Sequence, residues 1–289
     1  MVGQYDDPTM ARLVVPPTLE EACGLLEEAP GEAVPLAGGT ALQMLRRRGE
    51  FAAGTLVDLR RVPGLDRLQA AGGGVSIGAL VTHRRIESDP VVRRTVPVLA
   101  DMASQIANVR VRNAATLGGN LAHRDHRLDP PGVLMVLGAT VELASRHGRR
   151  TVPVGDLFTG CGDTVLAPGE LVVAVHVPAP PPGARAAFAK YKSLGANDWP
   201  CAAVAACLSG DDGRRTLDLG LTAVSPSPAA LRLDVSGLGL AAALDQADAA
   251  VSGVLAPVSD LRGSARFKAR VTRVLCRDTI DALWEGPQP

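Results

Sequence analysis

Apolar and polar positions alternate along this chain in a way that predicts helices and strands in close succession. Thr18, with Glu21 three residues later, is typical of a helix N-terminus and opens a stretch with apolar residues on one helical face. Apolar stretches at 33–36 and 55–59 predict strands. Between them, 41–48 predicts a helix that ends in three arginines, as the helix dipole favours. This order indicates an α/β unit at the start of the chain.

A hairpin and a series of helices are predicted for the middle of the chain. Apolar stretches flank three consecutive glycines, Gly72, Gly73 and Gly74, which is typical of a β-hairpin. The elements predicted after this hairpin are a helix from Thr82, a helix through 98–107, a buried apolar element at 133–143, and strands at 150–153 and 171–177.

A proline-rich stretch, 178–183, indicates a linker before the last part of the chain. Beyond it, 187–191, 201–208 and 217–224 predict antiparallel strands. A long helix is predicted over 264–283. The residues expected on its inner face are Phe267, Val271, Val274, Leu275 and Leu283. Together the patterns predict an α+β protein without internal repeats.

Composition excludes several classes of function. The chain has 289 residues, with 30 Lys and Arg against 30 Asp and Glu. This balance gives no electrostatic surface for nucleic acid or for an anionic membrane. No apolar run reaches the roughly 18 to 20 residues that span a bilayer. The first ten residues do not resemble a signal peptide, so we expect a soluble cytoplasmic protein.

The five cysteines are scattered and show no spacing typical of zinc or iron–sulfur ligands. An odd number of cysteines in a chain of this size favours free thiols in a reducing compartment. We therefore expect these residues to behave as small buried apolar side chains.

Two glycine-rich turns are the strongest chemical signal in the chain. The first, 37–42, lies between a predicted strand and a predicted helix, and the second is 116–120. Adjacent glycines let backbone N–H groups converge on an anion, and a following helix adds partial positive charge. Each turn alone also fits an ordinary structural turn, but the two together suggest a diphosphate held from both sides. Neither matches the Rossmann or Walker pattern.

Five stretches occur in the order found in one known family: 36–40, 57–59, 75–82, 111–122 and 166–171. On these residues the chain resembles the FAD-binding medium subunit of the molybdenum hydroxylases, the xanthine dehydrogenase and carbon monoxide dehydrogenase group. The closing segment 260–267 also fits that family, and the similarity is colinear from about residue 12 to residue 286.

The resemblance implies an α+β fold in which a two-part FAD-binding domain of the PCMH type precedes a smaller C-terminal domain with an antiparallel sheet and helices. The implied boundaries are 10–60 for the N-terminal α/β part, 61–178 for the second α+β part and 184–286 for the C-terminal domain.

The resemblance also implies a cofactor, FAD, and the residues that bind it. Backbone amides of 37–42 would hold its diphosphate, and 116–120 would hold the same region from the other side. Asp129 would hydrogen-bond the flavin, Lys190 would bring positive charge to its ring, and two apolar residues would flank it. The implied residues are Ala37, Gly38, Gly39, Thr40, Ala41, Leu42, Ile106, Thr116, Gly118, Gly119, Asn120, Asp129, Val172 and Lys190. No catalytic residue and no metal ligand is implied.

The implied function is electron transfer in a hetero-oligomer with an iron–sulfur small subunit and a molybdopterin large subunit. Electrons would pass from [2Fe-2S] clusters to FAD and then to an acceptor such as NAD, oxygen or quinone. Two alternatives stay open: a stand-alone FAD-dependent oxidoreductase of the same fold, and a flavin-free structural subunit.

One loop departs from the family pattern. Relatives usually carry small residues and proline between the second glycine turn and Asp129, whereas this chain has His123, Arg124, Asp125, His126 and Arg127. A metal site there would need ligands from elsewhere. We expect the loop to contact phosphates or a partner, or to be exposed.

Overall fold

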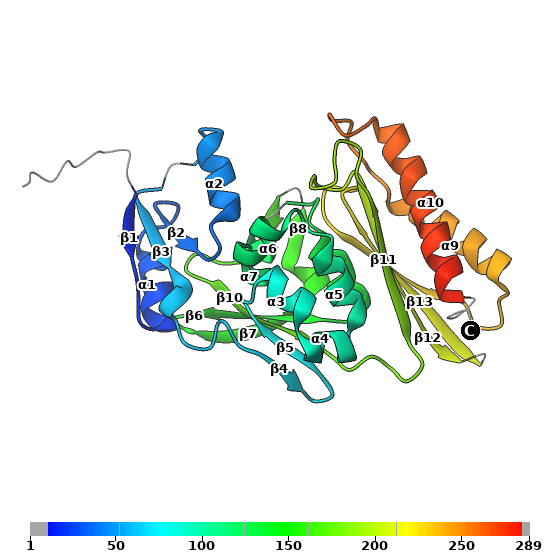
Figure 1. Ribbon diagram of the computed structural model, residues 1–289, viewed down its shortest axis with the longest axis horizontal. Coiled ribbons are helices and arrows are strands. Elements are labelled where there is room, and N and C mark those ends of the chain that lie inside the picture. Colours follow the sequence, from blue (N-terminus) through cyan, green and yellow to red (C-terminus); the bar gives the residue numbers. More distant parts are fainter. Residues whose placement is uncertain (1–10, 52, 124, 161, 212, 285–289) are drawn as a thin grey trace, which may run out of the picture.

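The computed structural model describes residues 11–284 except 52, 124, 161 and 212. Three sheets follow one another along its long axis (Figure 1). The first sheet is parallel, with β3 between β1 and β2. Its elements are β1 (Arg12–Val14), α1 (Leu19–Glu28), β2 (Ala33–Leu36), α2 (Thr40–Arg47), β3 (Thr55–Asp58) and a 3-10 turn at Leu59–Arg61.

The two helices of this first part are positioned differently. The Thr18 hydroxyl accepts a hydrogen bond from the Glu21 amide at 3.2 Å, which begins α1 where the sequence predicts it. Helix α1 then buries Ala22, Cys23 and Leu26 in a small core with β3. Helix α2 has no buried residue, so the turn before it, rather than the helix, fixes its place.

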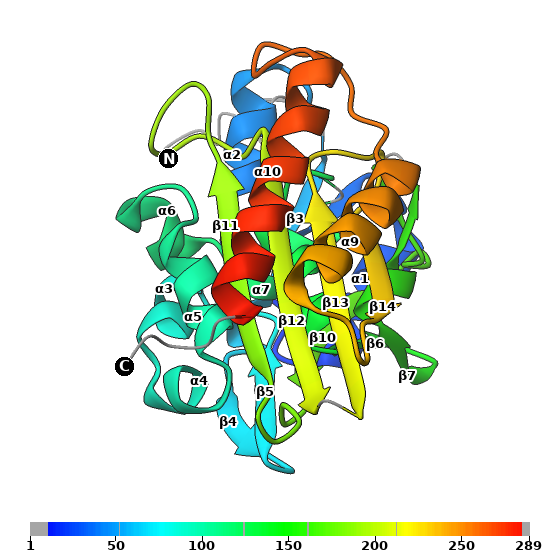
Figure 2. The same ribbon diagram turned by 90° about the vertical axis from the view of Figure 1, so that its right-hand side faces the viewer.

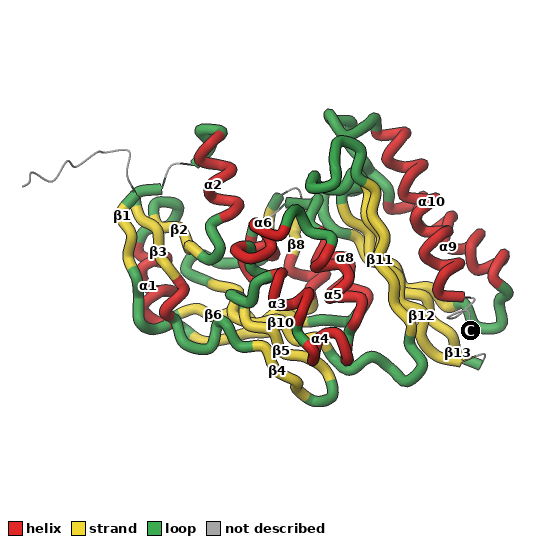
Figure 3. The backbone as a smooth tube through the Cα atoms, in the orientation of Figure 1, coloured by secondary structure: helices red, strands yellow, loops and turns green. Residues whose placement is uncertain are grey.

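The middle part is built on a five-stranded antiparallel sheet in the order β4-β5-β10-β6-β7. Helices pack on the side of this sheet that faces the third sheet, and they form the largest core with it (Figure 3). The strands are β4 (Leu68–Ala71), β5 (Gly74–Gly78), β6 (Thr140–Ser145), β7 (Gly148–Pro153) and β10 (Leu171–Val177), with a small hairpin of β8 (Phe158–Gly160) and β9 (Asp163–Thr164). The helices are α3 (His83–Ser88), α4 (Pro90–Thr95), α5 (Pro97–Ser104), α6 (Val109–Ala114), α7 (Leu117–Ala122) and α8 (Asp129–Val136), with a 3-10 turn at Val154–Leu157.

The last part is a four-stranded antiparallel meander covered by two helices on its outer face (Figure 2). Its inner face packs on α5 and α8 of the middle part. This packing fixes the third sheet against the second. The elements are β11 (Arg185–Tyr191), β12 (Ala202–Asp211), β13 (Arg214–Thr222), β14 (Ala229–Asp234), α9 (Leu240–Val254) and α10 (Ala265–Trp284).

Most predicted elements are confirmed, and two expected elements are wrong in detail. The helix through 98–107 ends at Ser104, because Ala107 adopts a positive φ of 42°. The apolar element at 133–143 is two elements, since it spans the end of α8 and the start of β6. Elements β1, β14 and α9 were not predicted, because their apolar residues do not stand out from the flanking sequence.

The inner face predicted for the last helix is confirmed at Val271, Leu275 and Leu283, which pack on the core, and is wrong at two positions. Phe267 and Val274 are 38% and 51% exposed, while Lys268, Thr272 and Cys276 are buried. Lys268 can be buried because its ammonium pairs with Asp260 at 2.9 Å and donates to a backbone carbonyl. The Thr272 hydroxyl is satisfied by the carbonyl four residues earlier. At these positions, polar residues with internal partners face the core in place of the apolar residues expected there.

Candidate cofactor site

A cavity of about 1000 Å³ extends between the three parts of the fold. Every residue that the sequence predicts for the cofactor lines it. These residues are Ala37, Gly38, Gly39, Thr40, Ala41, Leu42, Ile106, Thr116, Gly118, Gly119, Asn120, Asp129, Val172 and Lys190. Tertiary folding therefore brings together groups that lie up to 153 positions apart in the sequence.

The first glycine turn ends at the N-terminus of α2. Gly39 has a φ of 68° and is the N-cap of the helix, where no side chain accepts a hydrogen bond from the first-turn amides. A left-handed φ of this kind suits glycine. The open amides and the positive end of the helix dipole then favour an anion at this wall of the cavity.

The two glycine turns are packed directly on one another. A Cβ atom on Gly38 would lie 1.9 Å from the Ala114 carbonyl oxygen, in the segment that leads into the second turn. A Cβ atom on Gly119 would lie 3.5 Å from Cβ of Ala37 in the first. Glycine at position 38 is therefore needed for the two turns to meet, and their backbones border the same part of the cavity.

The second glycine turn, for which the sequence predicted no helix, is the first turn of a short helix. The Thr116 hydroxyl caps α7 by accepting a hydrogen bond from the Gly119 amide at 3.2 Å. Leu117, Gly118 and Leu121 are buried. The side-chain oxygen of Asn120 is buried without a hydrogen-bond partner among the described residues. It is a polar atom at the cavity wall that a cofactor can satisfy.

An ion pair between Lys190 and Asp129 lines the cavity. Lys190 comes from β11 and Asp129 from the first position of α8, and their side chains are 2% and 6% exposed. Burial raises the pKa of the Asp129 carboxyl, and the Lys190 ammonium acts in the opposite direction. The second carboxyl oxygen of Asp129 has no partner in the part of the chain that the structure describes.

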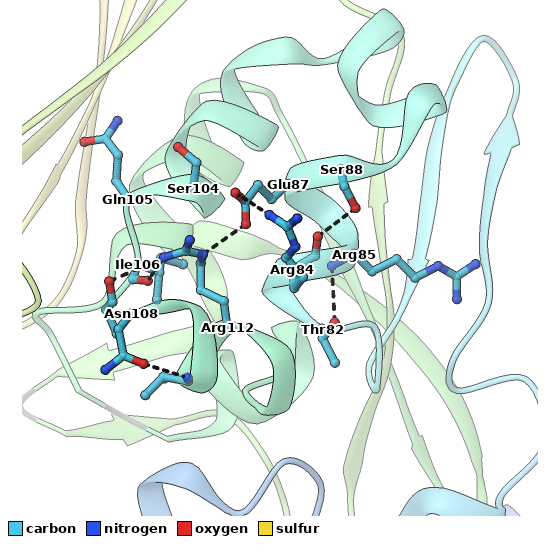
Figure 4. Close-up of polar contacts among 12 residues, drawn as sticks. Thr82, Arg84, Arg85, Glu87, Ser88, Ser104, Gln105, Ile106, Asn108 and Arg112 are labelled. Carbon is cyan, nitrogen blue, oxygen red and sulfur yellow. Dashed lines mark hydrogen bonds and ion pairs between the residues drawn. The ribbon is translucent and has the colours of Figure 1, made fainter.

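The wall that carries Ile106 is held by a partly buried arginine (Figure 4). Arg112 donates to the Glu87 carboxylate at 3.0 Å and to the Ile106 carbonyl at 3.1 Å. Burial would raise the pKa of Glu87, but hydrogen bonds from Arg84 and Arg112 outweigh it and lower this pKa. The Asn108 side chain caps the next helix through two backbone amides. These contacts fix the turn in which Ala107 has its positive φ.

Several cavity residues were missed from the sequence. Trp199 lines the cavity, where the Arg127 guanidinium lies 4.2 Å and that of Arg262 lies 5.5 Å from its ring centroid. Arg262 also pairs with Asp198 at 2.7 Å. Because these partners come from three separate segments, no local pattern could have revealed the arrangement. The only sequence signal was the rarity of tryptophan in this chain.

Another missed residue, His83, borders the cavity from α3. It is fully buried, and neither ring nitrogen has a hydrogen-bond partner among the described residues. Burial, with Arg112 and Lys190 nearby, lowers its pKa to about 4. His83 is therefore neutral at pH 7.

The histidine-containing loop is held by its own charges. Arg127 pairs with Asp125 at 2.6 Å, and burial lowers the pKa values of His123 and His126. Arg124 lies outside the described residues. Within the described ranges, no group of three His, Cys, Asp or Glu side chains is arranged to hold a metal ion.

The described cysteines are buried free thiols. Burial raises the pKa values of Cys23 and Cys207 to about 11 and that of Cys276 to about 12, and it also raises the pKa of Cys201. These four are thiols rather than thiolates at neutral pH. Cys161 lies outside the described residues.

Comparison with known proteins identifies the family and the fold. Residues 9–180 match the family described as the FAD binding domain in molybdopterin dehydrogenase. The chain is 32% identical to a carbon monoxide dehydrogenase medium chain of Afipia carboxidovorans over 92% of this chain and 94% of that one. The chain is an FAD-binding medium subunit of the molybdenum hydroxylase family. The predicted family, α+β fold and FAD cofactor are thereby confirmed.

Two further relatives cover nearly all of this FAD-binding subunit. One is subunit alpha of the 6-hydroxypseudooxynicotine dehydrogenase complex of Paenarthrobacter nicotinovorans, at 32% identity over 96% of this chain and 95% of that one. The other is a solved carbon monoxide dehydrogenase of Hydrogenophaga pseudoflava, with a TM-score of 0.89 and 31% identity over 95% of this chain and 97% of that chain. These relatives are subunits of oxidoreductases.

The cavity of the subunit fits FAD. It has the volume of a large cofactor site, a backbone wall at Gly38 that tolerates no side chain, and buried polar atoms of Asn120 and Asp129 that lack partners. No helix in the described part of the chain has both the length and the apolar character needed to span a membrane.

Proposed function

We propose that this chain is the electron-transfer subunit of a molybdenum hydroxylase complex. It receives electrons from [2Fe-2S] clusters of a partner subunit and passes them to an external acceptor. The observation that carries the proposal is the single cavity in which both glycine turns and the Lys190–Asp129 pair meet. The relatives support partner subunits, since their names describe a medium chain and a subunit of a dehydrogenase complex.

The glycine turns hold the FAD diphosphate in this proposal. Amides of 37–42 donate to one side of it, helped by the uncapped N-terminus of α2. Thr116, Gly118, Gly119 and Asn120 form the opposite side. The backbone amides of 117–120 are bonded within the fold, so this side is a fixed wall whose Asn120 side-chain oxygen is left for a donor of the cofactor. Because Thr116 caps its own helix, this second side is preorganised.

The ion pair acts at the other end of the site. FAD collects electrons one at a time and releases them as a pair, which is the chemistry it supplies when bound. With FAD bound, the buried Lys190 ammonium would favour the negatively charged reduced flavin. Asp129 orients Lys190 through one carboxyl oxygen, and its other oxygen would be available to the flavin. Ile106 and Val172 exclude water at the flanks.

A partner must supply the clusters. The four described cysteines are separate, buried and protonated, so they are poor ligands for an iron–sulfur cluster. The contacts in the cavity do not distinguish NAD, oxygen and a quinone as the electron acceptor. The cytoplasmic location and the division at 10–60, 61–178 and 184–286 also stay predictions.

The first experiment is the visible absorbance spectrum of the purified full chain, with the released cofactor identified. We expect a flavin spectrum and FAD. Isolation of the complex from its source cells should then yield iron and acid-labile sulfide in a second subunit. A yellow chain that is always free of an iron–sulfur partner would favour the stand-alone flavoprotein. A colourless chain that takes up no added FAD would contradict both redox functions.

Replacing Lys190 tests the role of the ion pair. In Lys190→Met, the buried Asp129 loses its counter-charge, and we expect about tenfold weaker FAD binding and a lower reduction potential of the bound flavin. Fluorescence titration and a dye-linked redox titration measure the two quantities. Lys192→Met is the control, because it removes the same charge two positions away, outside the cavity lining. Equal effects of the two variants would contradict the assigned role.

A further inference from the structure

A second, smaller cavity lies beside the FAD cavity at the C-terminal end of α2. Its volume is about 230 Å³, and we name it the annex. It shares five lining residues with the FAD cavity, including Arg48 and Arg127, so the two spaces adjoin. The polar residues that line the annex are Arg48, His123, Asp125, His126 and Arg127.

Arg48 supplies an uncompensated positive charge to the annex. It follows α2 directly and is exposed, and it forms no ion pair with any residue in the described ranges. The neighbouring side chains from α2 are the apolar Met44 and Leu45. They neither neutralise the charge of Arg48 nor accept hydrogen bonds from its five N–H donors.

Arg127 supplies a second, fixed guanidinium. Its Nε and Nη2 atoms donate to the two carboxylate oxygens of Asp125 at 2.9 and 2.6 Å, and its plane is placed by Trp199. Among the described residues, Asp125 is the only carboxylate that lines the annex, and Arg127 engages both of its oxygens. The annex therefore keeps a net positive charge from Arg48.

Two histidines complete the polar wall. His123 and His126 are half-buried residues of the same loop, and burial lowers the pKa of each. At neutral pH each ring is neutral and keeps one N–H donor. The annex thus combines one free guanidinium, one fixed guanidinium and two imidazole donors in a small space.

We propose that the annex binds a phosphorylated anion that is not part of FAD. Guanidinium groups present paired donors that match phosphate oxygens. The volume suits a phosphate or diphosphate group and is too small for a whole nucleotide. The proposed function already assigns the FAD diphosphate to the two glycine turns, so this second anion-binding site at the FAD cavity serves another molecule. That the bound anion is not FAD rests on the proposed function. That the annex binds an anion rests on Arg48 and Arg127.

The test uses the full chain, with flavin content measured first by absorbance. Isothermal titration with inorganic diphosphate and, separately, with NAD+ measures binding to the annex. The variant is Arg48→Gln. Arg47→Gln is the matched control, because it removes the same charge from the same exposed helix end and lines neither cavity.

We expect the unaltered chain to bind at least one probe, Arg48→Gln to bind it at least tenfold more weakly and Arg47→Gln within twofold, all with the same FAD content. Tighter binding of NAD+ than of diphosphate would make the ligand a dinucleotide acceptor of which only the diphosphate group occupies the annex. Equal binding would make it a free anion that regulates the site. The proposal is overturned if neither probe binds, if the two variants weaken binding equally, or if only Arg48→Gln loses FAD. A chain without FAD would contradict the proposed function, while diphosphate titration would still test the annex.

Discussion

The two glycine turns share a Gly-Gly pair but are built in opposite ways. The first turn leads into α2, which has no buried residue, and its N-terminal amides have no side-chain cap. The second turn opens α7, which buries Leu117, Gly118 and Leu121 and is capped by Thr116. The first turn leaves its backbone donors open to a ligand, whereas the second uses its donors in hydrogen bonds within the protein.

The difference shows that one sequence signal can serve binding and packing at the same site. Where donors stay open, the turn depends on its neighbour for support, and Gly38 meets the backbone at Ala114. Where the donors are capped, the turn is part of the core and supports its neighbour. Substitutions in the second turn should therefore cost stability, and those in the first should cost cofactor affinity.

The largest effect is expected for Gly118→Ala. The new Cβ would lie 2.5 Å from Cβ and 2.8 Å from Cα of Ala79, so buried backbone must move. We expect a loss of about 3 kcal/mol in the free energy of unfolding, measured by urea denaturation. Gly38→Ala should instead abolish FAD binding with a smaller stability loss, since α2 can shift outward. A reversed order of the two stability losses would contradict the comparison.

We also expect the loss of stability at acid pH to arise beside the second turn, at His83. His83 donates its backbone amide to the Ala115 carbonyl, and its buried ring has a pKa of about 4 against an ordinary value of 6.5. Between these values the unfolded chain binds the proton first, so stability is complete above pH 6.5 and falls as the pH drops toward 4. The loss is about 2 kcal/mol at pH 5.

Replacing the imidazole isolates this contribution. His83→Leu should remove this loss of about 2 kcal/mol in the free energy of unfolding at pH 5 and flatten the pH dependence between pH 6.5 and 4. Urea denaturation across this range measures it. The unaltered chain, measured in the same buffers, is the reference. An unaltered slope in His83→Leu would contradict a buried neutral histidine.

The smallest effect is expected from removing the side-chain cap of α7. Thr116→Val keeps the side-chain shape but removes the hydrogen bond to the Gly119 amide, and we expect a loss of about 1 kcal/mol in stability. Thr40→Val makes the same change in the first turn, where no side-chain cap is formed. It should leave stability unchanged. Thermal unfolding of both variants decides whether the two turns differ as described.

The sequence predicted the local elements well where apolar residues and caps agree. The strand at 33–36, the helix after Thr18 and the hairpin around Gly73 all depend on contacts within a few residues. The burial of Lys268 on the inner face of α10 could not be predicted, because its partners Asp260 and Val258 lie outside the helix. Burial of a polar side chain depends on partners that periodicity does not contain.

The sequence by itself determined the order of the elements, the two glycine turns and, through the resemblance, the cofactor. Only the tertiary structure decided that Asp129 and Lys190, 61 residues apart, form a buried pair. It also decided that Arg127 stacks on Trp199 and that Arg48 and Arg127 line one annex. Charges become chemically distinctive when burial removes water and fixes their partners, and both conditions arise from packing between distant segments.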